Sequence, residues 1–125
     1  MKVFGIGIDM VDLNRVNIIY SKYGDKFAKK ILNHDEFGGY ANAKNKPSFL
    51  AKRFAAKEAI GKALGVGLMN GFLLKNISIR HNESGKPTVK LSDKKQLQPY
   101  MGKDFYISIS DEKNFAIANA LILDK

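Results

Sequence analysis

Two acidic residues, Asp9 and Glu58, stand where their carboxylates could share a metal ion. Asp9 ends an alternating apolar segment that is typical of a strand, and Glu58 lies in a long apolar segment with helical spacing. A carboxylate among small and apolar side chains is costly to bury unless it is paired, hydrogen-bonded or metal-bound. Carboxylate oxygens, waters and substrate phosphates are the ligands that Mg²⁺ prefers. The two acids therefore predict a magnesium site that handles phosphates, with Mn²⁺ as the alternative metal.

Both acids also have an ordinary structural interpretation. Glu58 and Lys62 have the spacing of an ion pair on an exposed helix surface, which is worth about 0.2–0.5 kcal/mol. An acid that follows a strand, as Asp9 and Asp12 do, often caps the next helix. The residues alone leave these alternatives open.

Glycines and cations after Glu58 indicate contacts to a phosphate group. Gly65 and Gly67 could bring backbone N–H groups close to phosphate oxygens, while Arg53 and Lys62 supply positive charge. The alternative is that Gly65 simply ends a helix. The sequence contains no P-loop motif and no dinucleotide-binding fingerprint after its first strand.

The elements that must position these residues form an α+β pattern in one expected domain, residues 1–125. In a strand over residues 2–10, Gly5, Gly7 and Asp9 share one face, and two glycines on one face indicate that another segment approaches closely. A helical stripe over residues 13–32 is interrupted at Gly24, and Asp25 is the expected cap of its second part.

The rest of the chain alternates short helical and extended segments. We expect a polar loop over 38–47, a central helix over 49–64 capped by Ser48 and ended by Gly65, and a loop over 65–71. Strands follow over 74–80 and 88–91, then a short helix over 93–101, then an antiparallel hairpin of strands 105–110 and 115–123.

Charge and composition narrow the partners and the compartment. Lys and Arg number 21 against 12 acids, a net charge of +9 that attracts polyanions such as nucleic acid, phosphorylated small molecules, an acidic protein or an anionic membrane. The chain has no cysteine and only the histidines His34 and His81, both in polar segments, so a zinc site is disfavoured. No segment approaches the roughly 20 apolar residues that span a bilayer. We expect a cytoplasmic protein.

Several segments resemble the holo-[acyl-carrier-protein] synthases, in the same order and at the same spacing along nearly the whole chain. They are Gly5–Asp12 with Arg15, Phe49–Ala59 continued by Lys62–Gly65, Gly85–Pro87, and Ile107–Ser110 with Phe115–Ala118. The resemblance implies the 4′-phosphopantetheinyl transferase fold, with a mostly antiparallel sheet packed against a central helix. It also implies a homotrimer with active sites at the subunit interfaces.

The resemblance further implies a reaction. The 4′-phosphopantetheine group of coenzyme A is transferred to a serine of an acidic apo-acyl carrier protein, which leaves adenosine 3′,5′-bisphosphate. Asp9 and Glu58 fall on the family's magnesium-binding acids and Lys62 on its diphosphate-contacting lysine. Arg15 falls on an arginine of the helix that family members present to the carrier protein. These implied roles add to the phosphate contacts expected of Arg53, Gly65 and Gly67.

Some positions depart from the pattern of many family members. Val66 stands in place of the threonine of Gly-Thr-Gly, and Gly61 in place of the serine before Lys62. Asp111 replaces a histidine found in many members, which argues against a catalytic or nucleotide-contacting role for the turn Ser110–Glu112.

Other function classes explain the sequence less well. A small nucleic-acid-binding module would account for the positive charge, but the sequence lacks an obvious recognition motif and most of its aromatic residues fall on core stripes. A non-catalytic protein that only binds the carrier would not need Asp9, Glu58 and Lys62 intact. We therefore expect neither nucleic acid nor a membrane as partner.

Overall fold

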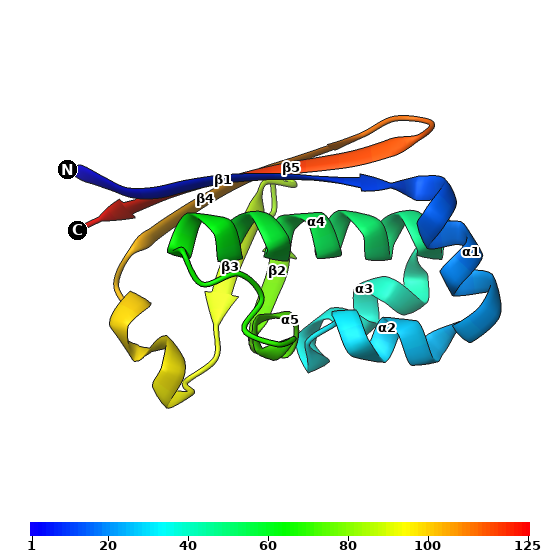
Figure 1. Ribbon diagram of the computed structural model, residues 1–125, viewed down its shortest axis with the longest axis horizontal. Coiled ribbons are helices and arrows are strands. Elements are labelled where there is room, and N and C mark those ends of the chain that lie inside the picture. Colours follow the sequence, from blue (N-terminus) through cyan, green and yellow to red (C-terminus); the bar gives the residue numbers. More distant parts are fainter.

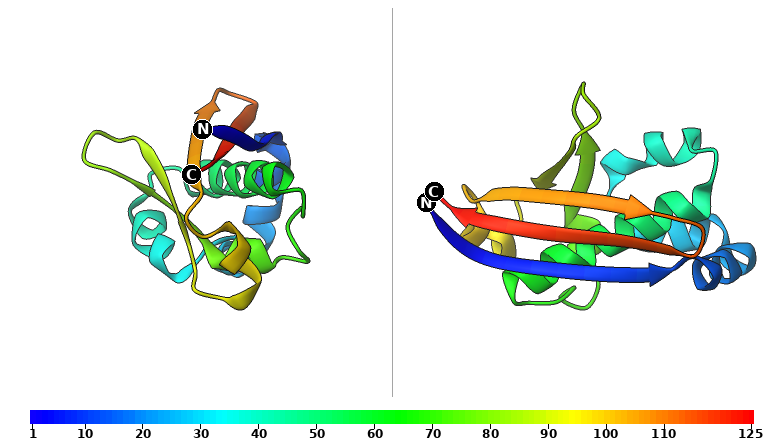
Figure 2. Two further views of the ribbon diagram at one scale, coloured as in Figure 1. Left: turned by 90° about the vertical axis from the view of Figure 1, so that its left-hand side faces the viewer. Right: turned by 90° about the horizontal axis from the view of Figure 1, so that it is seen from above.

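A long helix, α4 (Lys46–Leu64), runs through the middle of the protein beneath a three-stranded antiparallel sheet (Figure 1). The computed structural model describes residues 1–125. The sheet consists of β1 (Lys2–Asp12), β5 (Phe115–Asp124) and β4 (Asp104–Asp111), in that order. Seen from above, these strands lie side by side along the helix (Figure 2). The predicted α+β fold, with an antiparallel sheet on a central helix, is confirmed.

The other elements lie mostly on the opposite side of α4 from the sheet (Figure 1). They are α1 (Leu13–Tyr23), α2 (Asp25–Ile31), the 3₁₀ helix η1 (His34–Glu36), α3 (Phe37–Asn42), α5 (Phe72–Asn76), the antiparallel pair β2 (Ile77–His81) and β3 (Pro87–Leu91), and the 3₁₀ helix η2 (Lys95–Tyr100). The main hydrophobic core joins α4 to the inner face of the sheet and to β2. None of the helices combines the length and the apolar character that crossing a membrane requires.

Strand β1 lies directly on α4 because two of its residues lack side chains. A Cβ atom at Gly5 would come within 1.8 Å of the Ala63 carbonyl oxygen, and one at Gly7 within 2.1 Å of the Ala59 carbonyl oxygen. The close approach expected from these glycines is thus confirmed, and the approaching segment is the backbone of α4. This contact sets the distance between β1 and α4, the two elements that carry Asp9 and Glu58.

Replacing Gly7 by alanine is expected to destabilise the protein, because the new methyl group overlaps a helix backbone that cannot turn aside. The free energy of unfolding should fall by about 1–3 kcal/mol, the usual cost of overpacking. Urea denaturation followed by circular dichroism measures it. Gly38→Ala is the matched control, since a Cβ there meets no atom within 4 Å. An equal effect of the two substitutions would contradict the packing explanation.

The outer face of the sheet is apolar and exposed. Ile6 is 73% exposed, and Ile8 and Met10 are exposed beside it on β1. Phe115 and Ile117 of β5 add to this surface, because Met10 pairs with Ile117 across the two strands. Water therefore contacts a continuous apolar patch on the side of the sheet that faces away from α4.

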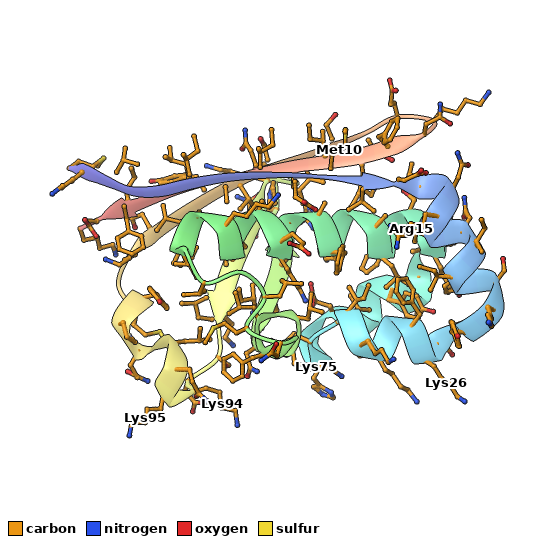
Figure 3. The ribbon with its side chains drawn as sticks, viewed as in Figure 1. Met10, Arg15, Lys26, Lys75, Lys94 and Lys95 are labelled. Carbon is orange, nitrogen blue, oxygen red and sulfur yellow. The ribbon has the colours of Figure 1, made fainter.

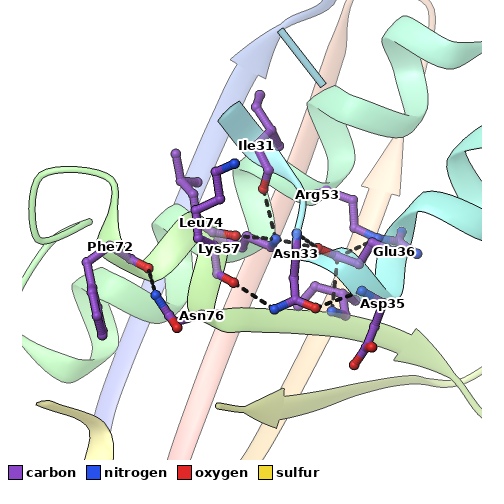
Figure 4. A network of polar contacts seen from close by, with 11 residues as sticks. Ile31, Asn33, Asp35, Glu36, Arg53, Lys57, Phe72, Leu74 and Asn76 are labelled. Atoms are coloured by element: carbon purple, nitrogen blue, oxygen red, sulfur yellow. Dashed lines mark hydrogen bonds and ion pairs between the residues drawn. The ribbon is translucent and has the colours of Figure 1, made fainter. Parts of the chain in front are cut away.

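A buried charged cluster holds α4 to the elements below it (Figure 4). The ammonium of Lys57, whose side chain is 0% exposed, donates to Glu36 Oε1 at 2.5 Å and to the carbonyl oxygens of Ile31 at 2.9 Å and Leu74 at 2.8 Å. Glu36 also lies 3.0 Å from Arg53 Nε, and its carboxylate accepts hydrogen bonds from backbone N–H groups. The cluster thus ties α2, η1 and α5 to the central helix.

Several local expectations were wrong. Asn45, not Ser48, caps α4: its side chain accepts from the backbone N–H of Ser48, which lies inside the helix. Pro47 is tolerated in the first turn, where its missing N–H has no helical partner. Asp25 does not cap α2; its carboxylate accepts a 2.6 Å hydrogen bond from the Tyr40 hydroxyl. Helix α3 occupies part of the expected loop 38–47.

Other boundaries were close to expectation. The first helical stripe breaks at Gly24, and α4 ends at Gly65, which has a left-handed backbone conformation with φ 80°. The final hairpin pairs β4 with β5 as expected. The strand expected over 74–80 begins only at Ile77, because residues 72–76 form α5.

Candidate active site

The structure brings Asp9 and Glu58 to one groove. The groove has a volume of about 480 Å³ and is bounded by the end of β1 and by α1, α2 and α4. Most of its lining is apolar, including Val16, Phe27 and Phe54, and its polar lining residues are Asp9, Glu58, Asp12 and Arg15. Asp9 shares the face of β1 that carries Gly5 and Gly7, so its side chain points toward α4.

Lys62 joins the two elements at this point. Its ammonium donates to Asp9 Oδ1 at 3.1 Å and to the carbonyl oxygen of Ile8 at 2.9 Å. The side chain of Lys62 is 50% exposed, whereas that of Asp9 is only 16% exposed. The ion pair expected as an alternative, Glu58 with Lys62, does not form, because the acid on the neighbouring strand takes the ammonium instead.

The carboxylate of Glu58 makes no hydrogen bond or ion pair within the chain, although it is half-buried. Burial raises its pKa above the usual value of 4.5, the negative charge of Asp9 raises it further, and the positive charge of Lys62 opposes both. A half-buried carboxylate without a partner, beside a second carboxylate, is an arrangement that a cation stabilises.

Helix capping, the alternative role considered for Asp9, is performed by Asp12 instead. Asp12 caps α1, because its Oδ1 accepts from the backbone N–H groups of Asn14 at 2.9 Å and Arg15 at 3.4 Å. Asp9 caps no helix. Arg15 lies at the start of α1, near the N-terminal part of α4 (Figure 3). It is exposed, has no ion-pair partner and lines the groove.

Arg53 does not line the groove. It is buried, its Nε lies 3.0 Å from Glu36 Oε2, and its guanidinium stacks 4.3 Å from the centre of the Phe49 ring. A direct contact of Arg53 with substrate phosphates stays a prediction that this position does not favour.

The N–H groups of the glycine loop after α4 are already used. Those of Val66 and Gly67 donate to the Gly61 carbonyl oxygen at 3.0 Å and 3.1 Å, and that of Gly65 donates to the end of the helix. The phosphate contacts expected from Gly65 and Gly67 stay predictions, and their visible role is to end α4. Gly61 fits the same turn, since a Cβ there would lie 2.2 Å from the Gly67 carbonyl oxygen.

The turn that departs from the family pattern contacts the N-terminal part of α4 through Asp111. Asp111 Oδ2 accepts a 3.3 Å hydrogen bond from the Ser48 hydroxyl and lies 4.0 Å from the ammonium of Lys52.

The sequence did not identify the apolar wall of the groove. Its residues Val16, Ile19, Phe27 and Ile31 follow the same helical spacing as core residues do.

The oxygen atoms around Asp9 and Glu58 fit a hard divalent cation. The candidate ligands are carboxylate oxygens, which suit Mg²⁺ or Mn²⁺ better than softer metals. An ammonium already lies against Asp9, which shows that this position attracts positive charge.

Comparisons with known proteins agree with the family resemblance seen in the sequence. Residues 5–120 match the model of the 4′-phosphopantetheinyl transferase superfamily. The chain is 40% identical over 123 residues to the holo-[acyl-carrier-protein] synthase of Aliivibrio salmonicida, with 97% of this chain and 98% of that protein covered.

Solved structures with the same fold include enzymes of the same description. The holo-[acyl-carrier-protein] synthase of Neisseria meningitidis superimposes with a TM-score of 0.87 at 35% identity, covering 98% of this chain and 99% of that one. The holo-[acyl-carrier-protein] synthase of Bacillus anthracis, in complex with CoA (3′,5′-ADP), superimposes with a TM-score of 0.84 at 32% identity over 100% of both chains.

Proposed function

The chain belongs to the 4′-phosphopantetheinyl transferase superfamily, and within it we propose that it is a holo-[acyl-carrier-protein] synthase. It transfers the 4′-phosphopantetheine group of coenzyme A to a serine of an apo-acyl carrier protein and releases adenosine 3′,5′-bisphosphate. The observation that carries the proposal is that Asp9 and Glu58, from a strand and a helix distant along the chain, line one groove. Lys62 adds a cation beside it through its contact with Asp9.

Asp9 and Glu58 would hold the divalent ion, Mg²⁺ or Mn²⁺. The half-buried, unpartnered carboxylate of Glu58 and the cation attracted by Asp9 support this assignment. When bound, the ion offsets the negative charge of the coenzyme A diphosphate during transfer.

The other residues bind and orient the substrates. The nucleophile is the serine hydroxyl of the carrier protein, so the chain needs no nucleophile of its own, and positioning and electrostatic stabilisation supply the catalysis. Lys62 is half-exposed at the edge of the groove, from which its ammonium can bind diphosphate oxygens. The lining of the groove beside these polar groups is mostly apolar.

An acidic carrier protein is the proposed second partner. Arg15 and the exposed lysines Lys22, Lys26, Lys29 and Lys30 of α1 and α2 have no ion-pair partner in the chain, and Figure 3 shows Arg15 and Lys26 on this side of the molecule. Unpaired cations beside the groove favour binding of a partner protein with an acidic surface, because the charges are complementary.

Reversing the charge of Arg15 should weaken binding of the carrier protein rather than the chemistry. Arg15→Glu is expected to raise KM for the carrier by roughly tenfold and to change kcat little, because a charge at the rim of an interface acts mainly on association. Initial rates at varied carrier concentration measure both constants. Lys94→Glu is the control, since Lys94 directly precedes η2 at the far end of the molecule (Figure 3). Equal effects of the two reversals would reject this docking surface.

The exposed apolar face of the sheet supports the trimer that the family resemblance implied. Ile6, Ile8 and Met10 would be covered by neighbouring copies of the chain, which would place subunit interfaces close to Asp9 on the same strand. Light scattering on the purified protein tests this assembly. The cytoplasmic location stays a prediction from the sequence.

The decisive experiment is a mass measurement. Purified protein, Mg²⁺, coenzyme A and an apo-acyl carrier protein are incubated together, and the carrier should gain the mass of one phosphopantetheine group at its serine. An unchanged carrier mass at saturating substrates would reject the proposed function. The same result separates the transferase from a nucleic-acid-binding module and from a protein that only binds the carrier.

A further inference from the structure

The ammonium of Lys62 contacts the Asp9 carboxylate, which is one of the two acids proposed to hold the divalent ion. It donates to Asp9 Oδ1 at 3.1 Å and to the Ile8 carbonyl oxygen at 2.9 Å, so it already occupies one oxygen of the carboxylate assigned to the metal. Glu58, one helical turn before Lys62 on α4, has no partner. The protein alone thus pairs one of its two acids internally and leaves the other unpaired.

We propose that Lys62 competes with the divalent ion for Asp9. In the metal-free protein its ammonium neutralises the Asp9 carboxylate, and binding of the ion displaces it. The released side chain is then free to bind the diphosphate of the nucleotide substrate. The inference rests on the proposed function, because it concerns the metal and the diphosphate of that reaction.

The surroundings of Lys62 and Asp9 support displacement of the lysine by the divalent ion. Lys62 is 50% exposed, so its flexible side chain can leave Asp9 without opening the core, whereas Asp9 is 16% exposed and held by β1. An ammonium held on Asp9 Oδ1 repels a divalent ion that approaches the same carboxylate, so the two cations compete for Asp9. Exposed ion pairs of this kind are weak, so the displacement lowers metal affinity only modestly.

A simpler alternative is that Lys62 affects metal binding only through its charge in the general field of the protein. Lys52 provides the matched comparison. It lies on the same helix, is partly exposed and is paired with Asp111 rather than with Asp9. Removal of either lysine takes away one positive charge, but only removal of Lys62 frees Asp9.

The test measures Mn²⁺ binding directly, with no coenzyme A present. Electron paramagnetic resonance counts free Mn²⁺ during titration of the wild-type protein and of the Lys62→Met and Lys52→Met variants. Lys62→Met is expected to bind Mn²⁺ about 3- to 10-fold more tightly than wild type, and Lys52→Met to differ by less than about 2-fold. Lys62→Gln repeats the measurement with a polar side chain, should the methionine variant fold poorly.

Three results would overturn the inference: no change or weaker binding in the Lys62 variants, equal tightening in Lys52→Met, or no Mn²⁺ binding by the wild-type protein. The carrier mass measurement separates this failure from failure of the proposed function. Tighter Mn²⁺ binding together with less carrier modification in Lys62→Met is the expected pattern. A wild-type protein that modifies no carrier rejects the function, while the Mn²⁺ titration still decides whether Lys62 competes for Asp9.

Discussion

Replacing Glu58 by glutamine is expected to lower kcat for carrier modification by about 10²- to 10³-fold, the usual cost of removing one electrostatic group from an active site. Glutamine keeps the size of the side chain but loses the negative charge that would hold the divalent ion. Because the Glu58 carboxylate has no partner in the chain, the fold should survive the substitution. Initial rates at saturating Mg²⁺ and coenzyme A measure the effect.

Stability gives an independent check on the same variant. Burial and the charge of Asp9 raise the pKa of Glu58 in the folded protein above 4.5, so its charged form opposes folding. Glu58→Gln should therefore melt at the same temperature as wild type or higher near neutral pH. The difference should fade as the pH falls through the raised pKa of Glu58 in the folded protein, because wild-type Glu58 then loses its charge as well.

Glu83→Gln is the control for a lost negative charge, because Glu83 is exposed in the turn between β2 and β3 and has no partner. It should leave kcat unchanged. A Glu58→Gln protein with wild-type kcat would remove Glu58 from the proposed site.

Replacing Lys57 by methionine is expected to lower the free energy of unfolding by about 3–5 kcal/mol, the cost of removing one partner from a buried ion pair. The carbonyl oxygens of Ile31 and Leu74 would lose their donor, and Glu36 would keep only Arg53 as a cationic partner. Urea denaturation measures the loss. Lys52→Met, which removes a partly exposed lysine from the same helix, should cost less than about 1 kcal/mol.

The lowered pKa of Lys57 should also make the stability of the wild-type protein depend on pH. Burial lowers the pKa of Lys57 to about 8, although the attraction of Glu36 opposes this shift. Between about pH 8 and 10.5 the folded protein releases this proton before the unfolded chain does, so the Lys57 contribution to stability rises with pH. Lys57→Met should lack that rise. A loss of stability below 1 kcal/mol in Lys57→Met would show that the cluster is not needed to hold α4.

Local signals were enough for much of the framework. The glycines of β1 indicated a close approach, Gly65 marked the end of the central helix, and the short turn between the last two strands indicated their pairing. Each of these features depends on neighbours along the chain or on a glycine conformation, so a single sequence contains the information.

Features that depend on distant neighbours were missed. Glu36 and Lys57 are 21 residues apart, and nothing in either segment indicates the other as its partner. Helical spacing suggested Lys62 as the partner of Glu58, but the fold places Asp9 nearer to the ammonium. Helix α3 was missed because its segment belongs to a polar stretch that was expected as a loop, yet burial of Tyr40 against Phe37 and Phe49 stabilises it.

The absent side chains at Gly5 and Gly7 have a consequence for which substitutions the protein can accept during evolution. Where strands and helices are separated by a layer of bulky residues, each exchange in that layer moves the elements that it separates. Here main chain rests on main chain, so the alignment of the acid on β1 with the helix carrying Glu58 and Lys62 does not depend on which residues fill the rest of the interior. Substitutions among the other interior residues should therefore leave the alignment of these three residues almost unchanged.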